Sequence, residues 1–196
     1  MNNMNNSKDK ITQYLENSIS CLTLLKDSVD TIEQIFNLIN DARSKKNRIY
    51  LIGNGGSSST ASHFVCDLNK TAKITGETRI RAFALNDNSP HVFAISNDIG
   101  FHAVFEEQLK NFLEKGDLVL AISGSGKSKN IINAVKYANK FGAITIGLTG
   151  NDGGELKKIC KHCLVVPSDK MYHIEDIHLI INHIIAFLFV GYSYEK

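Results

Sequence analysis

Two groups of ionisable side chains in this sequence have the residue types and spacing of a metal or acid–base site. His63 and Asp67 stand four residues apart, so on a helix the imidazole and the carboxylate share one face. A solvated surface pair has the same spacing and is the commoner explanation. Glu175 precedes His178 and His183, and at about 3.6 residues per turn it can share a face with either histidine. A histidine in this apolar stretch is a ligand or a core residue bonded to a backbone carbonyl, and the spacing leaves that choice open.

Two loops rich in glycine and serine have the composition of an anion site. They are Gly53-Asn-Gly-Gly-Ser57 and Ser123-Gly-Ser-Gly-Lys-Ser128, and each follows an apolar run and leads into a helix-like stretch. Small residues let backbone N–H groups approach a ligand, while the hydroxyls and the start of the next helix add donors and partial positive charge. One such loop is more often a tight turn with a serine cap. Two loops at one sheet edge favour a phosphate site.

Neither loop matches a nucleotide-binding motif. In the first, Ser58 stands where G-x-G-x-x-G requires its third glycine, and no acidic residue ends the second predicted strand. In the second, Ala121 stands where the P-loop requires its first glycine. The sequence therefore predicts a small phosphate-bearing ligand in place of a nucleotide.

The four cysteines are too few and too irregularly spaced for a disulfide framework. Cys160 and Cys163 have the spacing of half a zinc site, but no second pair accompanies them, so we interpret them as structural thiols. A net charge of +2 with both signs interspersed does not favour nucleic acid as a partner. The start of the sequence has no signal-peptide core, and no uncharged apolar run is long enough to span a membrane. We expect a soluble, cytoplasmic protein with no membrane partner.

The elements that position these residues follow from the apolar pattern of the 196-residue chain, which has the length of one domain. A polar leader (1–8) precedes a domain over 9–196, which opens with one long amphipathic helix or a broken pair. Short apolar runs then alternate with helix-like stretches, which predicts a five-stranded parallel sheet between two helical layers. The last helix, from Ile174 to about Tyr194, becomes apolar on all sides, and we expect it to contact another subunit. The predicted strands are 49–52, 80–85, 118–122, 144–148 and 164–166.

These motifs, in this order, resemble the phosphoheptose isomerases, which are SIS-domain enzymes. The resemblance covers nearly the whole chain. It implies the SIS fold and the interconversion of sedoheptulose 7-phosphate and D-glycero-D-manno-heptose 7-phosphate through an enediol, for heptose precursors of surface polysaccharide. The motifs that carry it are Gly-Asn-Gly-Gly-Ser (53–57), His63-Phe-x-x-Asp67, Ser96-Asn-Asp-x-Gly-Phe101, Ile122-Ser-x-Ser-Gly-x-Ser128, Leu148-Thr-Gly-x-Asp-Gly-Gly154, and Ile174-Glu-x-x-His178 followed by His183.

The resemblance also implies roles for individual residues and a homotetramer with one zinc ion per subunit. The proton transfers would fall to Asp67 and His183. The implied sugar contacts are Asn54, Gly55, Gly56, Asn97 and Asp98, with Asp67 and Glu175 also near the substrate. The implied phosphate contacts are Ser57, Ser123, Gly124, Ser125 and Ser128. The implied metal ligands are His63, Asp67, Glu175 and His183.

Two of these residues depart from the family pattern. Asp67 stands where glutamate is expected, and Glu175 stands where glutamine is expected. The second carboxylate would make a zinc site neutral, which predicts tighter metal binding and weaker polarisation of the substrate. The shorter Asp67 requires a compensating shift of backbone or substrate. Two alternatives therefore stay open, an isomerase of another phosphosugar and a non-catalytic SIS module that binds a sugar phosphate. The ionisable residues favour an enzyme, because a pure binder needs no base.

Overall fold

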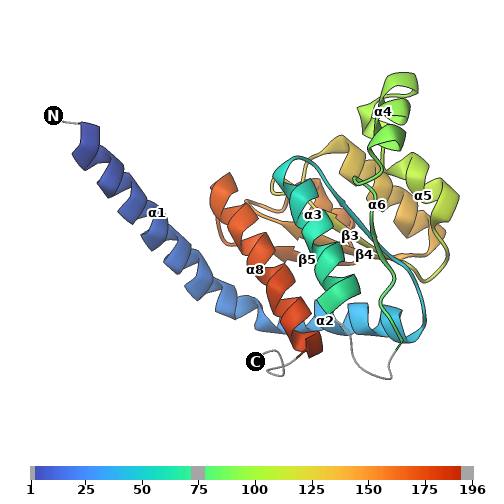
Figure 1. The fold of residues 1–196 in the computed structure, drawn as a ribbon, viewed down its shortest axis with the longest axis horizontal. Coiled ribbons are helices and arrows are strands. Elements are labelled where there is room, and N and C mark those ends of the chain that lie inside the picture. Colours follow the sequence, from blue (N-terminus) through green and yellow to red (C-terminus); the bar gives the residue numbers. More distant parts are fainter. Residues whose placement is uncertain (1–2, 72–77, 191–196) are drawn as a thin grey trace.

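Five parallel strands form one sheet at the centre of the molecule, with helices on both faces (Figure 1). The computed structural model describes residues 3–71 and 78–190. The sheet has the strand order β2-β1-β3-β4-β5, and every neighbouring pair is parallel. The predicted fold class is confirmed. The strands are β1 (Ile49–Gly53), β2 (Ala82–Ala84), β3 (Leu118–Ile122), β4 (Ile144–Thr149) and β5 (His162–Val165).

The buried strands have apolar side chains on both faces, as expected for a parallel sheet covered by two helical layers. Along β1, Ile49 and Leu51 belong to one core, and Tyr50 and Ile52 belong to the other. The first core lies beneath α2 (Val29–Ser44), α3 (Gly56–Cys66) and α8 (Met171–Val190). The second lies beneath α4 (Ser89–Asp98), α5 (Glu106–Phe112), α6 (Lys129–Phe141) and α7 (Gly154–Ile159). Short 3-10 turns occupy η1 (Lys26–Ser28) and η3 (Phe101–Ala103), and a π-helical stretch, η2, occupies Asp67–Thr71.

The chain order places the two loops beside each other. β1 and β3 are neighbours in register, from Ile49 opposite Leu118 to Gly53 opposite Ile122. From β1 the chain proceeds to β2 on one side, and from β3 it proceeds to β4 on the other. The loops that leave β1 and β3 therefore start side by side at the carboxyl edge of the sheet and continue in opposite directions. Ligands bind at such a position in open α/β folds.

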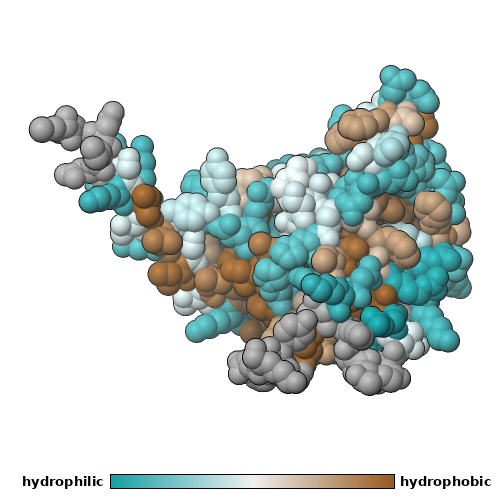
Figure 2. Space-filling view, viewed as in Figure 1, coloured by the Kyte–Doolittle hydropathy of each residue, from teal (hydrophilic) through white to brown (hydrophobic). Residues whose placement is uncertain are grey.

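The N-terminal region is a broken pair of helices, α1 (Asn3–Leu25) and α2, joined by η1. α1 begins at Asn3, so most of the segment that we expected as a polar leader is helical. The helix projects from the domain (Figure 1) and exposes apolar side chains, among them Ile11, Leu15 and Ile19. Hydrophobic atoms follow its length (Figure 2). Two polar contacts tie it to α8, because Tyr14 donates to Asp176 and Ser18 Oγ lies 3.1 Å from His173 Nδ1.

α8 is a core helix. By length and composition it is apolar enough to cross a membrane, but half of its apolar window is buried inside the molecule. Ile177, Ile181 and Ile185 pack in the first core. α8 begins at Met171, one turn before the predicted start, and the predicted end near Tyr194 lies outside the described residues. Contact of this helix with another subunit stays a prediction.

Candidate active site

The first loop turns from β1 into α3 within two residues. Gly55 has a φ of +53°, a conformation that favours glycine. A Cβ at Gly53 would lie 2.4 Å from the carbonyl oxygen of Ser57, so the strand end and the first turn of α3 leave no room for a side chain. α3 begins at Gly56, and Ser58 and Ser59 donate their N–H groups to the carbonyl oxygens of Asn54 and Gly55, which leaves the N–H groups of Gly56 and Ser57 for a ligand. This helix start is therefore a donor surface for an anion.

The second loop turns from β3 into α6 and gathers three hydroxyls. The Oγ atoms of Ser123 and Ser128 lie 3.4 Å apart, and Ser125 Oγ accepts a hydrogen bond from the Lys127 N–H at 3.3 Å. Gly126 has a φ of +63°, and a Cβ there would lie 2.2 Å from the carbonyl oxygen of Gly153. The loop after β4 therefore packs tightly against the serine loop and fixes its shape.

The two loops together line a cavity of about 280 Å³. Every residue that the family resemblance assigns to phosphate lies on it. A second cavity of about 400 Å³ shares Asn54 and Gly55 with the first and extends toward Asn86, Phe93 and Phe101. A larger cavity of about 510 Å³, beside Arg48, includes none of the predicted site residues. The first cavity is lined by Asn54, Gly55, Gly56, Ser57, Ile122, Ser123, Gly124, Ser125, Ser128, Met171 and Glu175.

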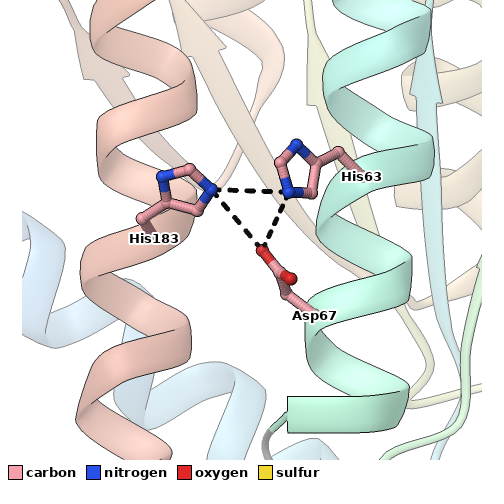
Figure 3. Close-up of side chains that lie close together, drawn as sticks. All are labelled: His63, Asp67 and His183. Atoms are coloured by element: carbon pink, nitrogen blue, oxygen red, sulfur yellow. Dashed lines mark hydrogen bonds and ion pairs between the residues drawn. The ribbon is translucent and has the colours of Figure 1, made fainter. Parts of the chain in front are cut away.

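Three ionisable side chains converge where α3 passes α8 (Figure 3). His63 and Asp67 come from the end of α3 and the start of η2, and His183 comes from α8. The two imidazole Nε2 atoms lie 3.5 Å apart. Asp67 Oδ2 lies 3.6 Å from His63 Nε2 and 3.7 Å from His183 Nε2. The three donor atoms form a nearly equilateral triangle.

This triangle fits a metal ion. Ligands at about 2.0–2.2 Å from zinc in a tetrahedral site stand about 3.3–3.6 Å from one another, close to the observed separations. Two imidazole nitrogens and one carboxylate oxygen are a donor set that zinc accepts, and three protein ligands leave a fourth position for substrate or water. The Asp67 side chain is 19% exposed, whereas those of His63 and His183 are 47% and 51% exposed. His63, Asp67 and His183 thus form a candidate metal site that opens toward solvent.

Asp67 stands where the helix changes its winding. Its backbone N–H still bonds to the carbonyl oxygen of His63, as in an α-helix, and the π-helical stretch η2 begins at the same residue. Single π-helical turns occur frequently at functional sites. The change in winding coincides with the residue that is one methylene shorter than the family pattern.

Glu175 does not join the other three expected metal ligands within this chain. It precedes His183 by eight residues on α8, which corresponds to a rise of about 12 Å along the helix. Its carboxylate instead faces the start of α3, where a Cβ at Gly56 would lie 2.8 Å from Glu175 Oε2. This axial separation places Glu175 at the first cavity, and its place among the metal ligands stays a prediction.

Asn97 and Asp98 lie apart from both cavities. They close the last turn of α4 and bond to each other, with Asn97 Nδ2 donating to Asp98 Oδ1 at 2.9 Å. α4 lines the second cavity with its first turns, through Ser89 and Phe93, and not with its last turn. The sugar contacts expected from this pair stay a prediction.

The open choice between two histidines is resolved by their positions. His183 lies in the candidate metal site, while His178 is fully buried, with its Nε2 3.3 Å from the carbonyl oxygen of Thr149. Burial lowers the pKa of His178 to about 4, so the ring is neutral at physiological pH and Nε2–H donates to this carbonyl. One turn later, the buried Asn182 donates from Nδ2 to the carbonyl oxygen of Thr60 at 3.4 Å. Both residues fasten α8 to the elements that carry the site.

Sequence reasoning did not identify Asn130, which is buried at the start of α6 and bonds to Asn54. Its position two residues after Ser128 is the available sequence signal, and it does not distinguish a structural asparagine from a helix-capping one. Cys160 packs against the second core. Burial raises the pKa of Cys160 to about 12 and that of Cys163 to about 11, so both thiols are protonated at neutral pH.

Comparisons with known proteins agree with this fold. A family model described as SIS domain matches residues 13–150. Phosphoheptose isomerase of Aliarcobacter butzleri is 35% identical over 176 residues, covering 90% of this chain and 93% of the relative. Solved phosphoheptose isomerases from Neisseria gonorrhoeae and Francisella tularensis each superpose with a TM-score of 0.87, at 28% and 29% identity, covering 93% of this chain and 97% of theirs. The chain is therefore an isomerase that belongs to the SIS-domain family, among the phosphoheptose isomerases.

Proposed function

We propose that this enzyme interconverts sedoheptulose 7-phosphate and D-glycero-D-manno-heptose 7-phosphate. The observation that carries the proposal is the placement of two sites on one helix. α3 begins in the phosphate cavity at Gly56 and carries His63 about two turns later, a rise of about 10 Å. With carbon–carbon bonds of about 1.5 Å, an extended seven-carbon chain spans about 8 Å between its phosphate-bearing end and C1. The helix thus matches the length of a heptose 7-phosphate.

The phosphate-bearing end of the substrate would be held by uncharged hydrogen-bond donors. The serine hydroxyls of the second loop and the N–H groups at the start of α3 converge on the same cavity. Contacts of this kind form in both the bound substrate and the transition state, so they contribute binding more than rate. They also fix the distance between C1 and the ionisable cluster, which orients the reacting carbons.

At the other end, the reaction requires a proton to leave C1 of the ketose, forming an enediol, and a proton to be delivered to C2, while the hydroxyl proton on O1 is lost and O2 gains one. We assign these transfers to Asp67 and His183. Oδ2 and Nε2 of these side chains belong to the metal triangle, so the protons would be carried by the remaining carboxylate oxygen, Oδ1, and the remaining ring nitrogen, Nδ1. When bound by His63, Asp67 and His183, a metal ion would polarise the carbonyl and hydroxyl oxygens as a Lewis acid. Zinc is our assignment, with one ion per subunit, because the donor set combines imidazole and carboxylate.

We further propose that the enzyme is a cytoplasmic homotetramer that supplies heptose precursors of surface polysaccharide. Exposed apolar side chains on α1 and at the end of α8, such as Leu15, Ile19 and Leu188, support assembly because soluble monomers rarely leave such surfaces uncovered. Light scattering at micromolar concentration tests this assignment. A monomeric mass would refute it.

An isomerase of another phosphosugar is the alternative that a specific observation favours. The Glu175 carboxylate adds a negative charge to the cavity that otherwise favours phosphate. The discriminating experiment incubates the protein with a panel of ketose phosphates and follows aldose formation by NMR. We expect conversion of sedoheptulose 7-phosphate and none by the His183→Ala variant. Conversion of a different ketose phosphate would establish the alternative, and binding without conversion of any would indicate a regulatory module.

A further inference from the structure

The side-chain amides of Asn54 and Asn130 form a reciprocal pair. Asn54 Nδ2 donates to Asn130 Oδ1 at 2.9 Å, and Asn130 Nδ2 donates to Asn54 Oδ1 at 2.9 Å. Asn130 is 2% exposed, and its Oδ1 also accepts from the N–H of Ile131 at 3.0 Å. Both oxygens and one hydrogen of each amide are therefore engaged. Such a pair admits one relative orientation of the two side chains, because the donor and acceptor of each amide must face their counterparts.

This pair joins the two halves of the phosphate cavity. Asn54 lies in the loop after β1, and Asn130 lies in the first turn of α6, two residues beyond Ser128 of the serine loop. The strands carry the loops side by side, but nothing in strand pairing fixes how far apart the loop tips stand. The amide pair is a direct side-chain connection between the first loop and the helix that follows the second.

We propose that Asn130 is a positioning residue for the phosphosugar site. By holding Asn54, it keeps the N–H groups at the start of α3 and the hydroxyls of the serine loop facing one phosphate. Without the pair, each loop keeps its own donors, but the two sets no longer converge on a fixed point. The identity of the ligand, a phosphosugar, rests on the proposed function. The geometry of the amide pair does not depend on it.

The inference changes how Asn54 acts. The resemblance implies that Asn54 contacts the sugar, but its amide oxygen and one amide hydrogen already bond to Asn130. Asn54 therefore serves the ligand chiefly through the backbone of its loop, and Asn130 decides where that backbone lies. Removing the Asn54 amide leaves the buried Asn130 with only the Ile131 N–H as a partner, so the Asn130 NH2 group loses its hydrogen bond inside the molecule, which is the costly case for a polar side chain.

The test measures binding of inorganic phosphate to the full-length protein by calorimetry, for wild type, Asn130→Ala, Asn54→Ala and the double variant. We expect each single substitution to weaken phosphate binding at least about tenfold. We expect the double variant to lose less than about twofold more, because the pair acts as one unit. Asn133→Ala is the matched control on the same helix, since Asn133 donates to the carbonyl oxygen of His102 outside the pair. Its affinity should stay within about twofold of wild type.

Two further measurements separate positioning from general loss of structure. Asn130→Ser retains one hydrogen-bonding group and should bind phosphate with intermediate affinity. If Asn130→Ala does not fold, Asn130→Ser replaces it in the comparison. In turnover assays Asn130→Ser should raise KM for the phosphosugar more than it lowers kcat. Wild-type phosphate affinity in folded Asn130→Ala or Asn130→Ser, additive losses in the double variant, or no phosphate binding by wild type would overturn the inference. If wild type binds phosphate but converts no heptose phosphate, the proposed function fails while the inference stands.

Discussion

His63 and His183 lie on different helices, 120 residues apart in the sequence, and their Nε2 atoms approach to 3.5 Å. Imidazole nitrogens this close cannot both carry a proton toward each other without repulsion, and Asp67 Oδ2 completes the triangle with them. Together the three side chains present three lone pairs to one point, which is what a divalent cation requires. Metal binding by the three residues can therefore be tested directly by substitution.

Removing one imidazole should release the metal. We expect purified wild type to bind about one zinc ion per chain and His63→Ala to bind at least tenfold more weakly, because two ligands remain of three. Elemental analysis after dialysis against chelator measures the loss. His91→Ala, on α4 and outside the cluster, is the control and should retain the ion. Full zinc content in His63→Ala would disprove the site.

Asp67→Ala and His183→Ala should each abolish turnover while the protein stays folded. Both side chains are assigned to proton transfer, and their atoms lie within 3.7 Å of each other. Steady-state kinetics and circular dichroism provide the two readouts. A variant that keeps more than about a tenth of kcat has lost less than about 1.4 kcal/mol of barrier stabilisation, which is too little for a direct role.

Glu175→Gln should strengthen phosphate binding. The carboxylate lies at the start of α3, where the helix dipole favours an anion, and it competes there with the ligand phosphate. Loss of the charge should improve the affinity for inorganic phosphate about two- to fivefold at low ionic strength, measured by calorimetry. Glu155→Gln on α7, where the carboxylate pairs with Lys136, should have no effect. Loss of bound metal from Glu175→Gln would instead restore Glu175 to the ligand set.

Ser125→Ala should raise KM for the phosphosugar more than it lowers kcat. Ser125 lines the cavity at the start of α3, whereas the ionisable cluster lies toward the other end of that helix. The Ser125 hydroxyl is assigned to the phosphate group, which it would contact in both the bound substrate and the transition state. Steady-state kinetics with wild type and the variant test this. An equal fall in kcat and kcat/KM would contradict the assignment.

Stability should decrease as the pH falls through the range set by His178. The unfolded chain binds a proton on this histidine below its ordinary pKa of about 6.5, whereas burial holds the folded pKa at about 4. The unfolded state therefore binds more protons between these values, and the free energy of unfolding should drop by up to about 3 kcal/mol from pH 6.5 to pH 4. Urea denaturation at several pH values measures the slope. Folded His178→Gln should show a shallower dependence, and an identical slope would disprove the contribution.

The sequence predicted the sheet and its loops because these depend on local patterns. Buried strands require continuous apolar runs, and the run 118–122 coincides with β3. Glycine and serine at strand ends likewise indicated the two loops that line the first cavity. The π-helical winding at Asp67 has no comparable local signature, since it depends on how α3 meets α8.

The positions of Glu175 and Asn130 depend on three-dimensional distances that sequence spacing does not contain. Helical periodicity allowed Glu175 to share a face with His178 or with His183, and it did not weigh the rise that separates Glu175 from His183 along α8. The Asn54–Asn130 pair arises only after two strands bring their loops together. In the same way, the sequence could not show that the last turn of α4 carries Asn97 away from both cavities.

The pairing of β1 with β3 also has a consequence for the order of events during folding. Ile49 pairs with Leu118, a separation of 118 − 49 = 69 residues. Forming the central strand pair therefore closes a long loop, and the entropy cost of closing it slows this step. Each phosphate-binding loop is attached to one of these two strands. When the chain refolds, recovery of phosphate affinity should therefore follow the formation of this strand pair.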